Sequence, residues 1–176
     1  MTTAEDRRDA EFTDYLRARQ PRLLRTAYLL TGDRAGAEDL LQTSLAKLYL
    51  SWDKVNRRDS VDAYLRRIMV NEHHSLWRRP WRRREVTVDR VPEDATVIDE
   101  YDEGQDARLW ELVQTLPRRQ RAVVVLRYYE ELSEAETAEV MGCSVGTVKS
   151  QASRALAALR TRAPRSLDPR PQEDER

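Results

Sequence analysis

Apolar residues recur at the spacing of an α-helix along nearly the whole chain, and the alternation expected of β-strands is almost absent. The pattern predicts a first helix from about Glu5 to Arg19. Pro21 suits the first turn of a second helix, and Gly32 suits its end. Asp33 can cap a third helix, whose inward stripe consists of Leu41, Leu45, Leu48 and Trp52. This part of the chain is therefore expected to be all-α.

A fourth helix is predicted after the polar loop "DKVNRRD", with Ser60 as its cap. The long face of this helix is expected to begin with Ala63, Tyr64, Arg67, Ile68 and Asn71. The helix runs into "WRRPWRRR", where Pro80 ends or kinks it. The first helical unit is thus expected to span residues 5–84.

Acidic residues dominate the stretch that follows, with eight acids against one arginine between Val91 and Glu111. Scattered apolar residues, helix breakers and many charges indicate a flexible, acidic linker over residues 85–105. A second helical unit is expected over residues 106–161, and the Pro-rich, charged tail over 162–176 is expected to be disordered. The fold class predicted is two small all-α domains joined by a flexible linker.

The second unit shows start and stop signals for several short helices. Its first helix carries Leu109, Leu112, Val113 and Leu116, and Pro117 starts the next, which holds the apolar run 123–126. Ser133 and Glu136 form a capping box, and Gly142 ends the helix that they open. Ser144 caps the last helix, whose inner stripe is Val145, Val148, Ala152, Ala155, Leu156 and Leu159. The two helices around Gly142 have the proportions of a helix-turn-helix.

The other side of the last helix carries short polar groups and two cations, which is the chemistry that contacts base edges and phosphates in a major groove. The candidate DNA-binding residues are Ser144, Gly146, Thr147, Lys149, Ser150, Gln151, Ser153 and Arg154. An ordinary solvated helix face is the alternative at this point.

Positive and negative charges balance at 31 each, but they are segregated along the chain. The stretch from Arg57 to Arg90 contains ten arginines and five acids, and the stretch from Arg118 to Arg165 contains nine basic residues and five acids. Two basic blocks around an acidic joint favour a polyanionic partner.

Several other classes of protein are disfavoured by the sequence. There is no apolar run of about 18 residues and no signal-peptide core, so neither a membrane span nor export is expected. The single Cys143 excludes an internal disulfide. His73 and His74 are adjacent and fall on different sides of a helix, without a Cys or acid at metal-ligand spacing. No catalytic set or phosphate loop is recognisable, so we expect no enzyme activity, metal or cofactor.

Three stretches together resemble a known family. "LPRRQRAVVVLRYYEELSEAETAEVMGCSVGTVKSQASRALAALR" resembles the C-terminal promoter-binding domain of bacterial sigma factors of the extracytoplasmic-function group. "LLRTAYLLTGDRAGAEDLLQTSLAKLY" is similar to the segment of those proteins that grips RNA polymerase, and "AYLRRIMVNEHHSLWRR" to their helix at the promoter −10 element. The resemblance covers roughly residues 10–161, with both domains in order.

The resemblance implies an initiation subunit located in the bacterial cytoplasm. Its partners would be promoter DNA and core RNA polymerase, through the coiled-coil of the largest subunit and the flap of the second-largest. The protein would recognise the −35 and −10 elements and assist DNA melting. An anti-sigma factor is a further partner that the resemblance leaves open.

The resemblance also implies roles for residues of the first unit. The polymerase contacts would be Asp39, Leu40, Gln42 and Thr43, and the −10 contacts would be Asn56, Arg57, Arg58, Arg66, Asn71, His74, Trp77 and Arg78. The loop that contains Asn56 would hold a flipped base. The chain departs from the family at Thr43, where an acid is usual, at Ser75, where Asp is usual, and at Tyr64, where Trp is common.

Alternatives remain open for each of these features. The ridge at Asp39 is by itself a solvated helix face, the loop at Asn56 a charged connector, and Trp77 a core residue. For the whole chain, the alternatives are a free-standing DNA-binding regulator, whose first half senses or dimerises, and a helical interaction protein that never touches DNA. The basic face of the last helix argues against the second of these.

Overall fold

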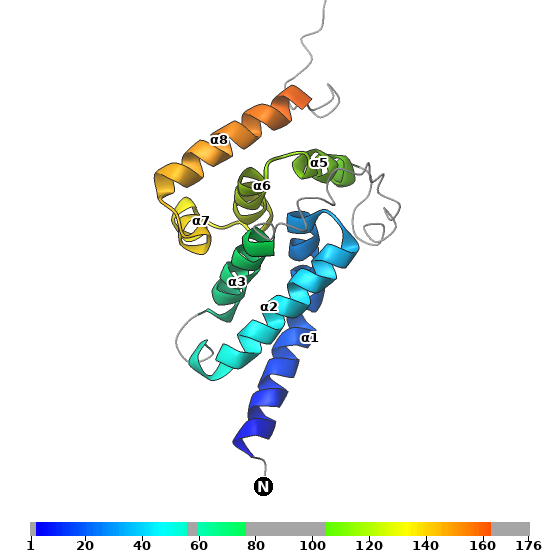
Figure 1. Ribbon diagram of the computed structural model, residues 1–176, viewed down its shortest axis with the longest axis vertical. Helices are drawn as coiled ribbons and strands as arrows, with labels where there is room; N and C mark the ends of the chain where they lie inside the picture. Colours follow the sequence, from blue (N-terminus) through cyan, green and yellow to red (C-terminus); the bar gives the residue numbers. More distant parts are fainter. Residues whose placement is uncertain (1–2, 56–59, 77–104, 163–176) are drawn as a thin grey trace, which may run out of the picture.

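The computed structural model describes residues 3–55, 60–76 and 105–162, in which helices are joined by short turns and no strand occurs (Figure 1). The predicted linker and tail fall mainly outside these ranges, as do Pro80 and residues 56–59 of the predicted loop. The first helical group consists of α1 (Ala4–Thr31), α2 (Arg34–Val55) and α3 (Val61–Leu76). The second consists of α5 (Gln105–Gln114), α6 (Arg118–Val124), the π-helical turn η2 (Val125–Tyr129), α7 (Glu134–Met141) and α8 (Val145–Arg162).

Helix α1 is a single helix, which corrects the prediction of two helices divided before Pro21. A proline inside a helix costs about 3 kcal/mol in lost hydrogen bonding and steric conflict. Packing along α2 on both sides of the proline offsets that cost. Before it, the Phe12 and Tyr15 rings contact Trp52, with ring centroids 5.2 and 5.5 Å apart; after it, Leu30 is fully buried. A capping box of Thr3 and Asp6, which the sequence analysis missed, starts the helix.

The helix ends elsewhere follow the predicted local chemistry. Gly32 and Gly142 both adopt the left-handed conformation that ends a helix, with φ of 89° and 61°. The side chains predicted to cap helices accept hydrogen bonds from backbone N–H groups three residues on: Asp33 from Gly36 at 2.7 Å, Ser60 from Ala63 at 3.4 Å, Ser133 from Glu136 at 3.1 Å and Ser144 from Thr147 at 3.1 Å. These predictions are confirmed.

The long face that was predicted to begin at Ala63 is not the inward face of α3. Its buried side chains are Leu65, Met69, Val70 and His73. Ala63, Arg67 and Asn71 are exposed, and Tyr64 and Ile68 lie at the edge of the buried face. The helical period was predicted, and the packing of α3 against both α2 and the second helical group decides which side of it is buried. Val145 was predicted to belong to the inner stripe of the last helix and is 39% exposed.

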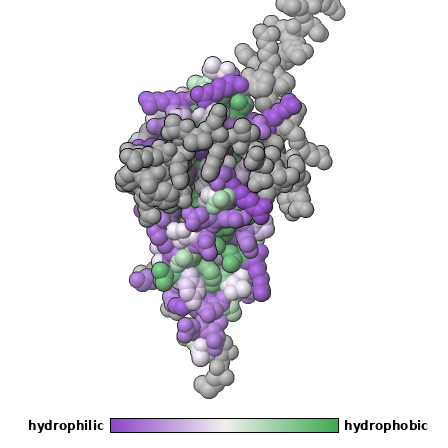
Figure 2. Space-filling model, turned by 45° about the vertical axis from the view of Figure 1, so that its right-hand side comes forward, coloured by the Kyte–Doolittle hydropathy of each residue, from purple (hydrophilic) through white to green (hydrophobic). Residues whose placement is uncertain are grey.

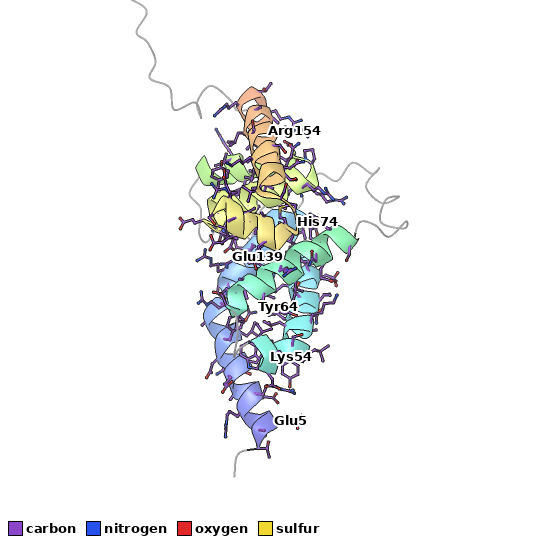
Figure 3. The ribbon with its side chains drawn as sticks, turned by 90° about the vertical axis from the view of Figure 1, so that its left-hand side faces the viewer. Glu5, Lys54, Tyr64, His74, Glu139 and Arg154 are labelled. Atoms are coloured by element: carbon purple, nitrogen blue, oxygen red, sulfur yellow. The ribbon has the colours of Figure 1, made fainter. Side chains whose placement is uncertain are left out.

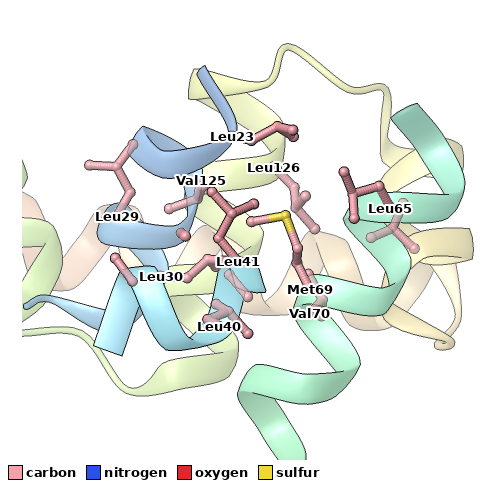
Figure 4. Packing of buried hydrophobic residues seen from close by; sticks show 14 of the residues in the cluster. Leu23, Leu29, Leu30, Leu40, Leu41, Leu65, Met69, Val70, Val125 and Leu126 are labelled. Atoms are coloured by element: carbon pink, nitrogen blue, oxygen red, sulfur yellow. The ribbon is translucent and has the colours of Figure 1, made fainter. Parts of the chain in front are cut away.

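The two helical groups share one hydrophobic core (Figure 4). One cluster contains buried residues of both groups. The first group contributes, among others, Leu23, Leu30, Leu41 and Met69, and the second contributes Ala122, Val125, Leu126 and Val140. Two smaller clusters complete the second group: one joins α5, α6 and α8, and the other joins α6, α7 and α8. On the face shown in Figure 2, hydrophilic residues predominate and hydrophobic ones form small scattered areas.

Candidate nucleic-acid and polymerase interfaces

The helix-turn-helix is built from α7, the turn at Gly142 and α8. Val123 of α6, Ala138 of α7 and Val148 of α8 form the small core that fixes the angle between the two helices. Val148, Ala155 and Leu159 keep the inner side of α8 buried. The opposite side of α8 is therefore held in one orientation by its own packing.

All eight residues predicted to contact DNA lie on the outer part of this motif. Six of them are exposed, namely Ser144, Gly146, Lys149, Ser150, Ser153 and Arg154, and Thr147 and Gln151 are partly exposed. Figure 3 places Arg154 on α8, far from Glu5 near the start of α1. Lys149 Nζ lies 3.5 Å from Glu134 Oε2, so this lysine is held beside the start of α7. The structure thus places six of the predicted −35 residues at exposed positions of this motif, and the other two on its side nearest to α3.

The predicted polymerase-binding residues divide into two kinds. Asp39 and Gln42 are exposed on α2, and Thr43 is partly exposed. Leu40 is 0% exposed and packs in the shared core. The prediction that its side chain contacts polymerase is therefore corrected. Leu40 lies on the inward side of α2, one residue from Asp39 but about 100° around the helix.

The same outward row of α2 contains a residue that the sequence analysis missed. Leu50 is 84% exposed, the highest value among the large apolar side chains that the structure describes. It lies eleven residues after Asp39, three helical turns along the same side. Leu50 was overlooked because it follows a stripe of core leucines closely in the sequence. Leu45 and Leu48 belong to that stripe, whereas Leu50 lies on the opposite side of the helix.

The predicted −10 residues are only partly described. Asn56, Arg57, Arg58, Trp77 and Arg78 lie outside the described residues. Asn71 is exposed on α3, whereas Arg66 and His74 face the second helical group.

His74 lies at the end of α3 nearest to α7 and α8 (Figure 3). Together with Thr147 and Gln151 of α8 it lines a cavity of about 100 Å³, whose other walls are Arg119, Val123, Met141, Gly142, Cys143 and Val148. One predicted −10 residue and two predicted −35 residues thus share one space.

Hydrogen bonds from the second group close the C-terminal end of α1. Gln114 Nε2 donates to the Leu29 carbonyl at 2.9 Å, and Arg121 Nη1 donates to the Leu30 carbonyl at 3.1 Å. Arg121 also donates to the carbonyls of Gln114 and Leu116, at 2.6 and 3.3 Å, and burial lowers the pKa of its guanidinium. These contacts satisfy helix-end carbonyls that would otherwise lack partners.

His73 is buried to 1% exposure on the inner side of α3. Neither of its ring nitrogens has a hydrogen-bond partner within the described part of the chain. Burial, followed by the positive charges of His74, Arg121 and Arg118, lowers the pKa of its imidazole to about 3. The ring is therefore neutral at pH 7.

Among the described residues, no group of three or more His, Cys, Asp or Glu side chains is arranged to hold a metal ion. Within the same ranges, no helix has the length and apolar character needed to cross a membrane.

Two family models match the chain in the order of its two helical groups. The model of Sigma-70 region 2 matches residues 15–83, and that of Sigma-70 region 4 matches residues 106–159. The RNA polymerase sigma-E factor of Streptomyces avermitilis is 44% identical over 167 residues, which cover 94% of this chain and 92% of the relative. The ECF RNA polymerase sigma factor EcfG of Rhodopseudomonas palustris is 31% identical over 160 residues, 84% of each chain.

This chain is a sigma factor of the extracytoplasmic-function group. Among solved structures, the sigma factor RpoE from Bartonella quintana, crystallised with the anti-sigma factor NepR, is similar to it, with a TM-score of 0.71 and 26% identity. That match covers 86% of this chain and 95% of the other. The predicted family and all-α fold class are confirmed.

As a sigma factor, the protein binds core RNA polymerase and recognises promoter DNA. Sigma factors are transcription initiation factors and not enzymes.

Proposed function

We propose that α8 of this sigma factor reads the −35 element of its promoters. The carrying observation is the exposed polar face of α8, opposite a side buried by Val148, Ala155 and Leu159. Ser150 and Gln151 are short enough to meet base edges near the start of the helix. Lys149 and Arg154 supply positive charge for phosphates. The hydroxyls of Ser144, Thr147 and Ser153 donate hydrogen bonds to the DNA backbone, and Gly146 permits a close approach to it.

The −10 element is assigned to the end of α2, the loop after it and α3. Asn56, Arg57 and Arg58 of that loop hold a base turned out of the non-template strand, which recovers part of the few kcal/mol lost on unstacking. Arg66, Asn71, His74, Trp77 and Arg78 contact the neighbouring backbone and bases. The sigma factor thereby assists melting through binding energy, while polymerase carries out the chemistry. The protein itself is therefore not an enzyme and needs no metal or cofactor.

Polymerase docking is assigned to the outward row of α2. Asp39, Gln42 and Thr43 provide polar contacts, and Leu50 on the same side supplies an apolar anchor of the kind that carries much of the energy of an interface. Region 4 meets the polymerase flap, and the complex forms in the bacterial cytoplasm, where an anti-sigma factor is a further partner. The domains are residues 5–84 and 106–161, with a linker between them.

The deciding experiment mixes purified protein with core polymerase and measures run-off transcription from a library of promoters. We expect the chain to co-purify with core polymerase and to confer initiation at a shared −35 and −10 sequence. Retention of DNA binding without any association with polymerase would instead identify a free-standing regulator.

The docking row has its own test. Asp39→Ala combined with Gln42→Ala should weaken association with core polymerase about tenfold, which corresponds to about 1.4 kcal/mol, while helicity by circular dichroism stays unchanged. Glu38→Ala is the matched control, because Glu38 is exposed on α2 beside these residues and pairs locally with Arg34. Equal affinity of the double variant and the control would remove the docking assignment.

A further inference from the structure

Glu130 lies directly after η2 and is a buried carboxylate that joins the two helical groups. Its side chain is 3% exposed. Oε1 accepts a hydrogen bond from Thr26 Oγ1 at 2.5 Å. Oε2 accepts from Arg66 Nε at 2.8 Å and lies 2.8 Å from Arg66 Nη2 and 3.4 Å from Arg22 Nη2. Three donors from α1 and α3 therefore converge on one side chain of the second group.

The carboxylate of Glu130 is nearly withdrawn from solvent, whereas Arg22 at the edge of the cluster is half exposed. The space between Glu130, Arg22, Arg66 and their neighbours is about 10 Å³, which is at most room for one water molecule. The side chain of Arg66 is 17% exposed, so this arginine is largely withdrawn from solvent. A buried carboxylate of this kind persists only where its oxygens are matched by charged or hydroxyl donors, as they are here.

The same contact occupies an arginine that promoter binding needs. The guanidinium of Arg66, to which the −10 contact was assigned, is directed at Glu130 with two nitrogens on one oxygen. A carboxylate and a DNA phosphate present the same anionic oxygens to a guanidinium. One arginine in this geometry cannot satisfy both.

The arrangement around Glu130 also brings the two DNA-binding surfaces too close together. His74 of α3 and Gln151 of α8 line one cavity of about 100 Å³. Promoter elements at −35 and −10 are about 25 base pairs apart, which is about 85 Å of duplex at about 3.4 Å per base pair. Residues that share one cavity cannot meet both elements, so DNA recognition requires the two groups to separate.

We propose that Glu130 is an internal competitor of promoter DNA, a carboxylate that takes the place of a −10 phosphate on Arg66 and so holds the free sigma factor closed. This inference rests on the proposed −10 role of Arg66. We call Glu130 and its donors Arg66, Thr26 and Arg22 the latch. Thr26 and Arg22 are its supporting part, because they bind the same carboxylate from α1 without belonging to either DNA-binding set. Opening frees Arg66 for the promoter and leaves Glu130 in water.

The test uses the full-length free protein and the variants Glu130→Gln and Thr26→Val. Glu130→Gln keeps the shape and removes the negative charge, and Thr26→Val keeps the shape and removes one donor. Glu139→Gln is the matched control, because it makes the same charge change at an exposed position of α7. Small-angle X-ray scattering gives the radius of gyration. Fluorescence anisotropy gives the affinity for a labelled duplex that carries a promoter transcribed by the wild-type holoenzyme.

Glu130→Gln should expand the free protein and bind the duplex about tenfold more tightly, since a hydrogen bond to a charged group typically contributes enough for a change of that size. Thr26→Val should change both quantities in the same direction but less, and Glu139→Gln should match the wild type. If Glu130→Gln and Thr26→Val both have the same radius of gyration as the wild type, the proposal is overturned. Expansion without tighter DNA binding also overturns it. If the wild-type holoenzyme transcribes no promoter, the proposed function fails, while the scattering data still decide whether Glu130 holds the groups together.

Discussion

At the scale of single residues, several side chains have contacts that only the assembled helices provide. His73 is a polar ring packed among apolar side chains of α3, near two arginines of α6. Glu130 is the reverse case, a charged group buried with a full set of donors. Both side chains lie where the two helical groups meet, and burial there lowers the pKa of His73.

His73 predicts a specific dependence of stability on pH. The folded state keeps the imidazole neutral down to a pKa of about 3, whereas the unfolded chain takes up a proton near pH 6.5. The unfolded state therefore binds more protons between these values, and stability falls as pH decreases through this window, by about 1.4 kcal/mol per pH unit. His73→Leu should remove this contribution.

Urea unfolding at several pH values from 7.5 down to 4.5 would measure this effect. The difference between His73→Leu and wild type at pH 7.5 is the reference, because both side chains are uncharged there in the folded state. Parallel pH profiles for the two proteins would contradict the prediction.

The outward residues of α8 predict two different effects on DNA binding. Lys149→Ala should weaken holoenzyme binding to all promoters alike and lower the slope of log affinity against log salt by about one unit. Gln151→Ala should cost about 1–3 kcal/mol on the cognate −35 sequence and little on others. Filter binding on matched and scrambled −35 elements at several salt concentrations separates the two. A uniform effect of Gln151→Ala across sequences would remove its role as a base reader.

At the scale of elements, the helix-turn-helix depends on one backbone conformation at its turn. Gly142 has a φ of 61°, and its N–H group bonds to the Glu139 carbonyl at 3.2 Å to close α7. No other atom lies within 4 Å of where a Cβ would stand, so a side chain there meets no steric obstacle beyond its own backbone. The cost of a substitution is then conformational alone.

Gly142→Ala is expected to destabilise the protein by about 1–2 kcal/mol, the cost of placing an L-residue with a Cβ in the left-handed region. Gly142→Asn should cost less, because asparagine tolerates that region. Thermal unfolding of both variants checks the order. Equal melting temperatures for wild type and Gly142→Ala would show that the turn is not held in this conformation.

At the scale of the whole molecule, the two helical groups are tied by a common core in addition to the chain between them. Leu126 of η2 is fully buried in the cluster that includes Leu30, Leu41 and Met69 of the first group. Residues of the cluster formed by α5, α6 and α8, such as Leu159, support only the second group. Removing apolar volume at Leu126 should therefore destabilise both helical groups, whereas removing it at Leu159 should destabilise the second group alone.

Leu126→Ala should lower stability by about 2–5 kcal/mol, through lost burial and the cavity left behind. Hydrogen exchange should then accelerate in α1 and α2 as well as in α6, because the shared cluster supports all three. Leu159→Ala is the control, and its faster exchange should be confined to residues 105–162. Unchanged protection of α1 and α2 in Leu126→Ala would contradict a shared core.

Features that depend only on neighbouring residues could be predicted from the amino-acid sequence. The helical period, the caps at Asp33, Ser133 and Ser144, and the turn at Gly142 arise from contacts within four residues, so they could be predicted and are confirmed. The polar outward face of α8 followed from the same local period. The family could be identified because these local signals occur in a characteristic order.

The tertiary structure alone decided which way each helix faces and what it meets. Helical periodicity fixes the spacing of buried positions but not their phase, so the inward face of α3 and the burial of Leu40 appeared only in the packed molecule. Pro21 fits inside α1 because α2 packs along both halves of that helix. From the sequence alone, Glu130 would be expected at the surface, because it is charged. It is buried because Thr26, Arg22 and Arg66, at least 64 residues away, supply the donors that make burial of its charge tolerable.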